Sequence, residues 1–371
     1  MSHQTCACGR TMHHAAKMCL ACRYPGATPA PASPAPPAEP TVDTDRSSRT
    51  ARNELTSLKA RYKEALETID RQAFELDAIN KISTPVDTFA IEPSVGSEGT
   101  NEAVVVLVAS DWHSEEIVLP ERVNYVNEHN SEISKARAIK FFQNGLKLTR
   151  LIEAGVKVPT IIVPLLGDFC TNDIHDADNA ENNDLMPIDA YLAVQETIAS
   201  GFQFLLNHST ANIVVPCHSG NHARTTHKTR IAGEKGHSLE YFMYRNLAKQ
   251  FGAEDRLTFL ISEGYHSFLN VYDVLVRWHH GHAIKYQGGV GGLYIPVNKA
   301  INQWNKVRHA DLDVFGHFHQ CRDGGNFISN GSLIGWNSYA EFIKADFEVP
   351  KQQMFVIDKK HGLTCNWPIY V

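Results

Sequence analysis

Two histidines that stand one residue apart, His317 and His319, follow a short apolar run and a glycine in the segment DVFGHFH. In extended backbone, residues i and i+2 point to the same side, so the two imidazoles are expected to face one point. Imidazole is the commonest side-chain ligand of metal ions, whereas a packed apolar core has little use for such a pair. The segment therefore indicates a metal site.

The same arrangement recurs after four other apolar runs, which alternate with segments expected to be helical, at residues 131–154, 188–207 and 238–251. The four runs are AVVVLVAS, TIIVPLL, ANIVVPC and VYDVLVRW. Their length and composition are typical of buried strands. In open α/β sheets, ligands bind outside the carboxyl ends of the strands, so polar residues that follow the runs are expected to converge. They are Asp111, His113, Asp168, His218, Asn221, His222, His279, His280, His282, His317 and His319.

The chemical types in this set narrow the choice of ligand. A selection of two aspartates, one asparagine and four histidines contains no cysteine and mixes carboxylate oxygen with imidazole nitrogen, which suits Mn²⁺, Fe or Zn²⁺ better than Ca²⁺. Seven ligands are too many for one tetrahedral site. They fit two divalent ions that share a bridging carboxylate.

The ordered motifs DWH, GD, GNH, HHGH and GHFH, between Asp111 and His319, resemble those of the calcineurin-like metallophosphoesterase superfamily. Within it, the chain looks most like phage and bacterial phosphoesterases related to the nuclease subunit of double-strand-break repair complexes. The resemblance implies an α/β (α+β) fold, a two-sheet sandwich flanked by helices. It covers the last three-quarters of the chain.

The resemblance also implies a role for each matching residue. The first metal ion is held by Asp111, His113 and His319, the second by Asn221, His280 and His317, and Asp168 bridges the two. His222 is the implied catalytic acid. In HHGH, the histidine directly before the glycine is the implied ligand, which selects His280 over His279 and His282. One departure is Ala223, because the family often has an acidic residue at that position, which orients the catalytic histidine.

The expected activity is hydrolysis of phosphodiester bonds by a metal-bridging hydroxide, with nucleic acid, DNA or RNA, as the expected substrate. A phosphomonoesterase acting on a protein or small molecule is the first alternative, and a non-catalytic nucleic-acid-binding scaffold is the second. Two loops beside the motifs are candidates for substrate contact, the acidic segment 170–187 with His175 and the basic segment 222–237 with Arg224. Both are equally compatible with solvated loops.

The first hundred residues have a different composition. Residues 1–23 contain two close cysteine pairs, Cys6 with Cys8 and Cys19 with Cys22, a pattern typical of a small module with one structural Zn²⁺. Residues 24–48 are Pro/Ala-rich and predict an extended linker. Residues 49–83 predict a coiled-coil helix and hence a homodimer, because apolar residues recur with a heptad period; an amphipathic helix docked on its own domain is the alternative. Residues 84–101 predict a second linker, and 102–371 the phosphoesterase domain.

Bulk properties set outer limits. Over 371 residues the apolar content is 43% and the net charge is −6, so any contact with nucleic acid needs a local basic patch. The chain has no apolar run of the length that a membrane span needs and no apolar leader. With eight cysteines and no such leader, a reducing compartment is expected: the cytoplasm, or the host cytoplasm if the chain is phage-encoded.

Overall fold

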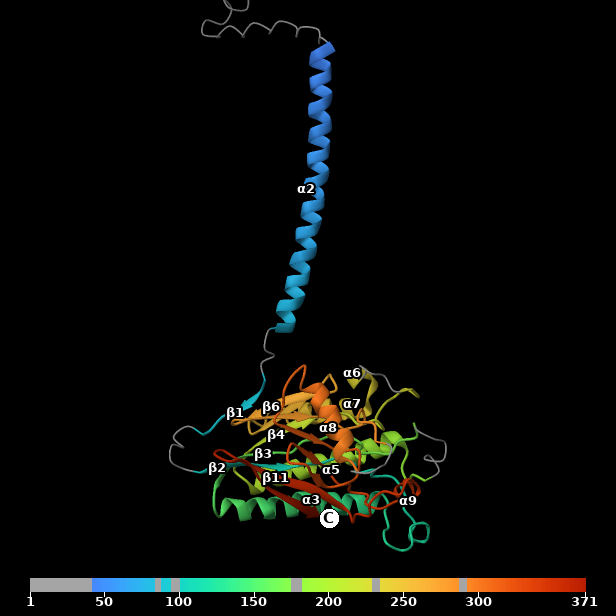
Figure 1. The fold of residues 1–371 in the computed structure, drawn as a ribbon. Helices are drawn as coiled ribbons and strands as arrows, with labels where there is room; N and C mark the ends of the chain where they lie inside the picture. Colours follow the sequence, from blue (N-terminus) through green and yellow to red (C-terminus); the bar gives the residue numbers. More distant parts are fainter. Residues whose placement is uncertain (1–41, 84–87, 95–100, 175–181, 229–233, 287–291) are drawn as a thin grey trace, which may run out of the picture. The chain divides into compact units, whose positions relative to one another are not determined.

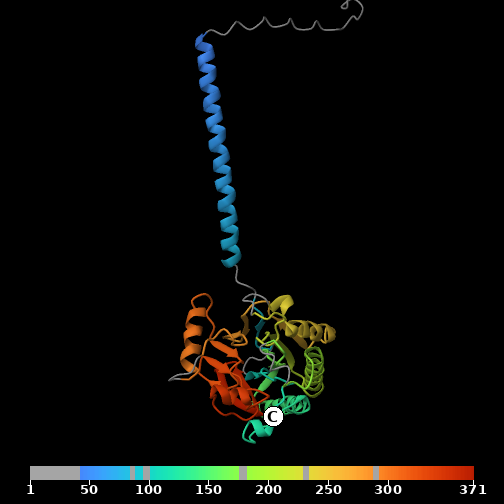
Figure 2. The same ribbon diagram turned by 90° about the vertical axis from the view of Figure 1, so that its right-hand side faces the viewer.

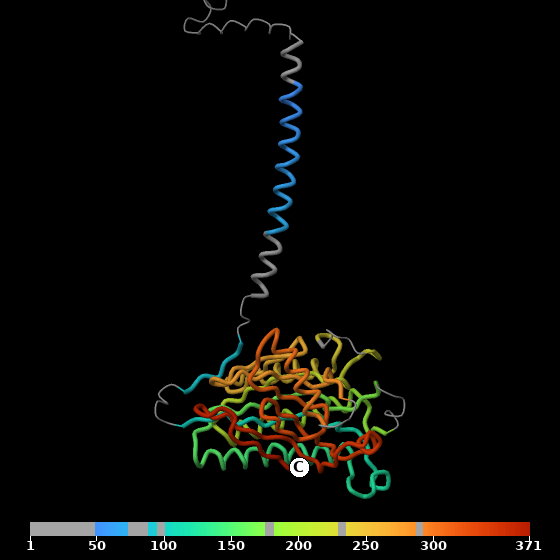
Figure 3. The backbone as a smooth tube through the Cα atoms, in the orientation of Figure 1, coloured from blue at the N-terminus to red at the C-terminus, as the bar shows by residue number. Residues whose placement is uncertain are grey.

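The computed structural model describes residues 42–83, 88–94, 101–174, 182–228, 234–286 and 292–371 (Figures 1 and 3). The chain divides into two compact units, Met1–Pro85 and Val86–Val371. The cysteine module with Cys6, Cys8, Cys19 and Cys22 lies outside the described residues, as does His175. In the part of the chain that the structure describes, no helix is long and apolar enough to cross a membrane.

The described part of the first unit is the helix α2 (Val42–Ser83). It begins seven residues before the predicted start at residue 49, so residues 42–48 are not part of the linker. The last proline before it is Pro40. The helix ends two residues before Pro85 because a proline disfavours helical backbone in the residue that precedes it.

The second unit contains two six-stranded sheets. Its strands are β1 (Ala90–Ile91), β2 (Glu102–Leu107), β3 (Lys157–Ile162), β4 (Asn212–Cys217), β5 (Leu257–Ile261), β6 (Ser267–Val271), β7 (Val274–Trp278), β8 (Leu312–Phe315), β9 (Arg322–Asp323), β10 (Phe327–Ser329), β11 (Lys351–Asp358) and β12 (Gly362–Tyr370). Its helices are η1 (Pro120–Arg122), α3 (Ser131–Glu153), α5 (Pro187–His208), α6 (Glu234–His237), α7 (Leu239–Gln250), α8 (Tyr294–Trp304) and α9 (Ser338–Ile343).

Strand order shows how distant segments meet. One sheet runs β12-β11-β2-β3-β4-β5, with β2 to β5 parallel and β11 antiparallel to β2. The other runs β1-β6-β7-β8-β10-β9, with β7, β8 and β10 parallel. The carboxyl ends of β2, β3 and β4 therefore share one edge, and those of β7 and β8 share an edge of the second sheet.

Alternation along β2 separates two apolar cores. Ala103, Val105 and Leu107 pack with side chains of α3, α5 and α7, whereas Val104 and Val106 pack between the two sheets. A third cluster joins α8 to the other face of the second sheet through Val297 and Phe315. The result is a helix–sheet–sheet–helix sandwich (Figure 2), which agrees with the two-sheet fold that the family resemblance implies. Both faces of β2 are buried, which explains its continuous apolar run.

Local signals account for the helix boundaries. The Asn130 side chain accepts a hydrogen bond from the Ile133 N–H at the start of α3 (2.9 Å), and Ser238 does the same for Tyr241 at the start of α7 (3.2 Å). Pro187 occupies the first turn of α5, a position where its missing N–H costs nothing. All three helices lie within two residues of their expected bounds.

Two expectations need correction. The run VYDVLVRW is not one strand, because Tyr272 and Asp273 form the turn between β6 and β7. The predicted linker 84–101 contains β1, whose Ala90 and Ile91 pair with β6. A two-residue strand carries no periodic signal, and β1 is fixed by pairing with a segment some 180 residues away, so local sequence could not reveal it.

Candidate metal centre

The carboxyl-terminal strand edges of the two sheets place side chains of Asp, Asn and His together. Asp111 and His113 follow β2, Asp168 follows β3, and Asn221 follows β4, all from one sheet. The other sheet supplies His280 after β7, and His317 and His319 after β8. The site therefore lies where two sheets meet, rather than along the edge of one.

One group consists of Asp111, His113 and His319, with one potential ligand atom from each residue within 4.8 Å of the others. The Nε2 atoms of His113 and His319 are 3.2 Å apart, and His319 Nε2 is 3.5 Å from an Asp111 carboxylate oxygen. The backbone N–H of His317 donates to both carboxylate oxygens of Asp111, at 2.9 and 3.0 Å, which fixes that carboxylate against the loop that carries the two histidines.

A second group consists of Asp168, His280 and His317. His280 Nε2 is 2.8 Å from an Asp168 oxygen and 3.1 Å from the side-chain oxygen of Asn221. His280 Nδ1 donates to the Leu166 carbonyl at 2.6 Å, since a carbonyl can only accept. The free Nε2 of a neutral His280 would thus face two oxygen acceptors, an arrangement that needs a positive charge between them.

These distances show which histidine of the HHGH segment lies in the group with Asp168. Neighbouring residues in extended backbone point to opposite sides, and His279 accordingly faces away from the group, stacked on Phe315 with ring centroids 5.1 Å apart. His282 contacts His280 through a ring-centroid distance of 5.6 Å. Of the three, His280 is the one with a described contact to Asp168, and it is the histidine that the family resemblance selects.

Backbone conformation at the site is unusual. Five of the seven expected ligands have φ between 46° and 71°, a left-handed region that costs free energy for residues other than glycine. Such strain persists only where the surroundings over-determine it, and it concentrates at functional sites. The five residues are Asp111, His113, Asp168, His317 and His319.

Two glycines let the loops approach closely. A Cβ on Gly220 would collide with the Asp168 carboxylate, and a Cβ on Gly316 would collide with that of Asp111. The glycines in the GNH and GHFH motifs are therefore required by contact with the carboxylates of the GD and DWH motifs.

The electrostatics of the site call for a cation. Burial lowers the pKa of His280, but the Asp168 carboxylate outweighs burial and raises that pKa to about 10. Burial raises the pKa of Asp168, yet His280 and His222 hold it well below its usual range. Without a metal ion, His280 is therefore protonated beside an ionised Asp168. A divalent ion can take the place of that proton.

Two other histidines stay neutral and so keep a lone pair available. Burial, followed by the nearby His222 and His319, holds the pKa of His113 well below its usual range. Burial and then His280 do the same for His317. Neutral imidazole, ionised carboxylate and amide oxygen form a donor set that fits a divalent ion, so these buried groups could bind a metal ion.

His222 lies beside the first group, with its ring centroid 4.9 Å from that of His113. Its backbone N–H donates to Asp168 at 2.9 Å, and its Nδ1 donates to the Thr171 carbonyl at 2.7 Å. The Thr171 carbonyl therefore orients the His222 ring, a contact for which the family resemblance implies an acidic side chain at position 223. Ala223 is fully buried in the core instead.

Glu240 of α7 was not foreseen. Its two carboxylate oxygens accept from the backbone N–H groups of Phe169 at 2.8 Å and Gly220 at 2.7 Å, so it holds together the loops that carry Asp168 and Asn221. Burial, and then Asp168, raise its pKa to about 8. Nothing in the sequence of α7 distinguishes this residue from a glutamate on a solvated helix face.

Arg224, a predicted substrate contact, lies in the same loop as Asn221 and His222. Its guanidinium donates to the backbone carbonyls of Asn221, Thr226 and His227. These bonds give Arg224 a part in shaping the loop. Contact with a substrate remains a prediction.

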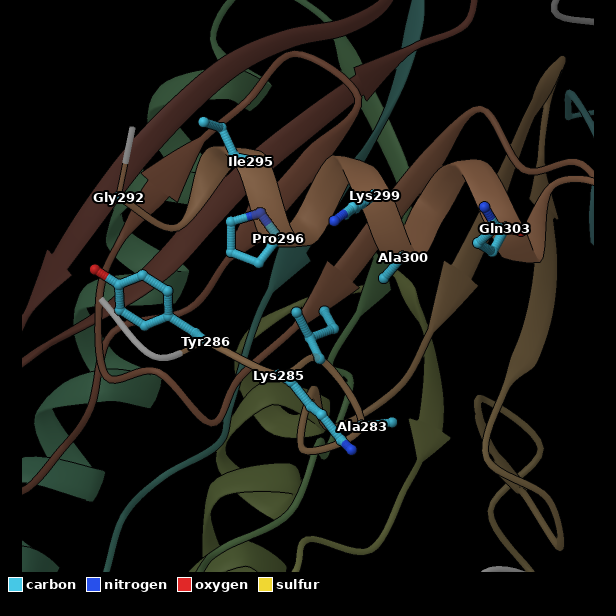
Figure 4. Close-up of a pocket in the computed structure, with 10 residues that line it drawn as sticks. Ala283, Lys285, Tyr286, Gly292, Ile295, Pro296, Lys299, Ala300 and Gln303 are labelled. Atoms are coloured by element: carbon cyan, nitrogen blue, oxygen red, sulfur yellow. The ribbon is translucent and has the colours of Figure 1, made fainter. Parts of the chain in front are cut away.

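An open pocket of about 640 Å³ lies along α8 (Figure 4). Lys285, Tyr286, Lys299 and Gln303 line it together with apolar side chains, and none of the described lining residues is acidic. Tyr286 contacts Phe318 with ring centroids 6.3 Å apart, and Phe318 contacts His317 at 5.0 Å. Tyr286 of the pocket is therefore connected to His317 of the candidate metal centre through the ring of Phe318.

Comparison with known proteins adds little to these observations. No protein-family model and no curated protein matches the chain. Among solved structures, the chain is similar to Vps29 of Chaetomium thermophilum, with 11% sequence identity over 72% of this chain and 98% of that chain and a TM-score of 0.29. At that TM-score the similarity supports no conclusion about activity.

Proposed function

We propose that the chain is a phosphoesterase that depends on two divalent cations and hydrolyses phosphodiester bonds, with nucleic acid as its substrate. The observation that carries the proposal is the convergence of oxygen and nitrogen acceptors from both sheets onto two adjacent groups. The ordered motifs and their resemblance to calcineurin-like metallophosphoesterases support the same activity.

In this proposal, each group holds one cation. Asp111, His113 and His319 would hold the first, and Asn221, His280 and His317 the second. Asp168 would serve both, because its oxygens approach His280 on one side and His113 and His222 on the other. When bound, a pair of divalent ions lowers the pKa of a water to near neutral and offsets negative charge on the phosphoryl oxygens.

His222 would protonate the departing oxygen. With Nδ1 donating to the Thr171 carbonyl, the ring keeps one orientation, and Nε2 is the atom that would carry the transferred proton. A carbonyl orients the ring without adding the negative charge of a carboxylate. Proton transfer from a positioned side chain typically accelerates such reactions by about 10²–10⁴-fold.

The pocket along α8 supports a polymeric substrate. Lys285 and Lys299 are exposed on its lining, which gives a locally basic groove in a chain of net charge −6. Lysine binds phosphate as a point charge, and a tyrosine face accepts a stacked base. The phosphates that flank the scissile bond would therefore lie along this groove, starting from Tyr286.

The activity is tested with two small substrates, bis-p-nitrophenyl phosphate and p-nitrophenyl phosphate, in the presence of Mn²⁺. The proposal predicts turnover of the diester that Asp168→Asn abolishes and that the exposed control Asp255→Asn leaves unchanged. Preferential turnover of the monoester would instead favour the phosphomonoesterase alternative. No turnover of either, with metal bound, would favour a non-catalytic scaffold.

The substrate class is tested by anisotropy of a fluorescent single-stranded oligonucleotide bound to Asp168→Asn protein. Reversing both groove charges with Lys285→Glu and Lys299→Glu should weaken binding and reduce the slope of log affinity against log salt by about 1 per lost phosphate contact. The matched control reverses Lys140 and Lys147, which are exposed on α3. Equal effects of the two double variants would contradict the groove as the binding surface.

A further inference from the structure

A chain of hydrogen bonds runs from the start of α9 to the ring of His113. The Asn337 side chain caps α9 by accepting from the Ala340 N–H at 2.9 Å. Its amide nitrogen donates to Glu116 Oε1 at 2.8 Å. The Thr171 hydroxyl donates to Glu116 Oε2 at 3.0 Å, and the Thr171 oxygen lies 2.9 Å from His113 Nδ1.

The direction of every bond in this chain is fixed. Because the Asn337 side-chain oxygen is occupied by the helix cap, only its NH₂ group can face Glu116. A carboxylate can only accept, so Thr171 must use its single hydroxyl hydrogen toward Glu116. The Thr171 oxygen is then left as an acceptor, and His113 must donate to it from Nδ1–H. In a neutral ring, Nε2 therefore keeps its lone pair.

That lone pair points at the candidate cation site. His113 Nε2 is the atom that lies 3.2 Å from His319 Nε2. Asn337, Thr171 and His113 are all buried, with exposed fractions of 3–4%, and Glu116 between them is half-buried. The backbone carbonyl of His113 is held as well, since it accepts from His129 Nε2 at 3.2 Å.

From this geometry we propose that Glu116 and Thr171 are positioning residues, which fix the tautomer and the ring orientation of His113 so that Nε2 can bind the first cation. The proposal rests on the proposed cation site and is independent of the substrate. Groups that orient a metal-binding histidine typically change metal affinity by about 10–100-fold when they are altered. Only the affinity for the first cation should change, because the described hydrogen bonds from Asn337 through Glu116 and Thr171 end at His113. They reach no residue of the second group.

Replacing Glu116 by Gln should reverse the donor–acceptor direction of the hydrogen bonds from position 116 to His113. Asn337 still donates to the side-chain oxygen at position 116, so the new NH₂ group faces Thr171 and donates to it. The Thr171 hydrogen then turns toward His113 Nδ1, which becomes an acceptor. The proton of the neutral ring moves to Nε2, the atom that would bind the cation. A change of one atom thus distinguishes a directed chain from simple packing.

Two readouts on the full chain test the proposal. Isothermal titration with Mn²⁺ should show the first-site affinity reduced by about 10–100-fold in Thr171→Val and Glu116→Gln and kept in Thr171→Ser, which retains the hydroxyl. Two-bond ¹H–¹⁵N correlation of ¹⁵N-histidine in metal-free protein should show a proton on Nδ1 of His113 in the unchanged protein and on Nε2 in Glu116→Gln. Thr149→Val is the matched control, because Thr149 is also buried and its described hydrogen bond is to the Gly145 carbonyl within α3.

The outcomes separate this proposal from the proposed function. Unchanged Mn²⁺ affinity and an unchanged His113 tautomer in Glu116→Gln would overturn it, as would equal losses in Thr171→Val and Thr149→Val. If the unchanged protein binds no Mn²⁺, the proposed cation site is wrong. The tautomer measurement then still decides whether Glu116 and Thr171 fix the proton position on His113. If Thr171→Val does not fold, Thr171→Ser and Glu116→Gln carry the test.

Discussion

At the scale of single residues, the centre is held by groups whose hydrogen bonds admit one arrangement. His280 donates from Nδ1 to Leu166, and His222 donates from Nδ1 to Thr171. His113 follows the same rule through the hydroxyl of Thr171. In each ring an acceptor on the protein side fixes a proton on Nδ1.

Gly220 is expected to tolerate no side chain. Gly220→Ala places a methyl group against the Asp168 carboxylate, and because this contact is with a fixed, buried group, we expect a loss of about 1–3 kcal/mol in the free energy of unfolding. Chemical denaturation measures the loss. In the control Gly252→Ala, the nearest atom to the new methyl is 3.3 Å away at an exposed site, and a comparable loss there would contradict the explanation.

His266 should make the fold sensitive to acid. Burial, and then the neighbouring His279, lower its folded-state pKa from 6.5 to about 3, so the unfolded state binds its proton first as pH falls. Stability from this group is complete above about pH 6.5 and is lost on the way down to about pH 3, by up to about 1.4 kcal/mol per pH unit.

The His266→Phe variant removes this titration. Its free energy of unfolding, compared with that of the unchanged protein by denaturation at several pH values, should show a difference that grows in favour of the variant below pH 6.5. A difference that is constant with pH would show that His266 titrates alike in both states.

At the scale of secondary-structure elements, α7 joins the loops that carry Asp168 and Asn221 through the side chain of Glu240. Glu240→Gln replaces one acceptor oxygen with an NH₂ group that faces a backbone N–H of Phe169 or Gly220. An unsatisfied buried polar group costs about 1–3 kcal/mol, so the variant should unfold that much more easily and bind Mn²⁺ more weakly. Glu153→Gln at the exposed end of α3 should change neither quantity.

Much of the element pattern was predictable because its causes are local. The apolar runs that became β2, β3, β4 and β8, and the caps at Asn130 and Ser238, carry their signals within a few residues. The division into two sheets was expected only from the family resemblance, and β1 could not be predicted because it depends on pairing with β6.

The candidate site was predictable to the same extent. Asp and His residues that follow apolar runs can be recognised from their type and position in the sequence. The structure brings all seven expected ligands and His222 together. Thr171, Glu116 and Glu240 were missed because nothing in their immediate sequence distinguishes them. Their roles arise from contacts between residues that are 20 to 221 positions apart. The cysteine module and His175 lie beyond the described residues, so those predictions stand as they were.

At the scale of the whole molecule, α2 presents an apolar stripe without a partner among the described residues. Leu55, Leu58, Tyr62 and Ile69 are 52–66% exposed, and they follow the heptad pattern. We also propose that a second copy covers this stripe in a parallel coiled coil, since Glu54 and Lys59 then occupy g and e positions that face one another with opposite charges.

Deletion of residues 49–83 tests the dimer. Sedimentation equilibrium of the full chain should give twice the mass of one chain, and the deleted form should give the mass of a single chain. The double variant Leu58→Lys and Tyr62→Lys provides a milder test, because charges in an apolar seam should dissociate it without shortening the helix. A full chain that sediments as a monomer would contradict the coiled coil.

The central claim is that the strand ends of both sheets hold a pair of divalent ions. Anomalous diffraction from crystals of the full chain grown with Mn²⁺ tests it most directly. The account predicts two peaks about 3.5–4 Å apart, one beside Asp111, His113 and His319 and the other beside Asn221, His280 and His317, with Asp168 between them. Density without a peak at these residues, at saturating Mn²⁺, would contradict it.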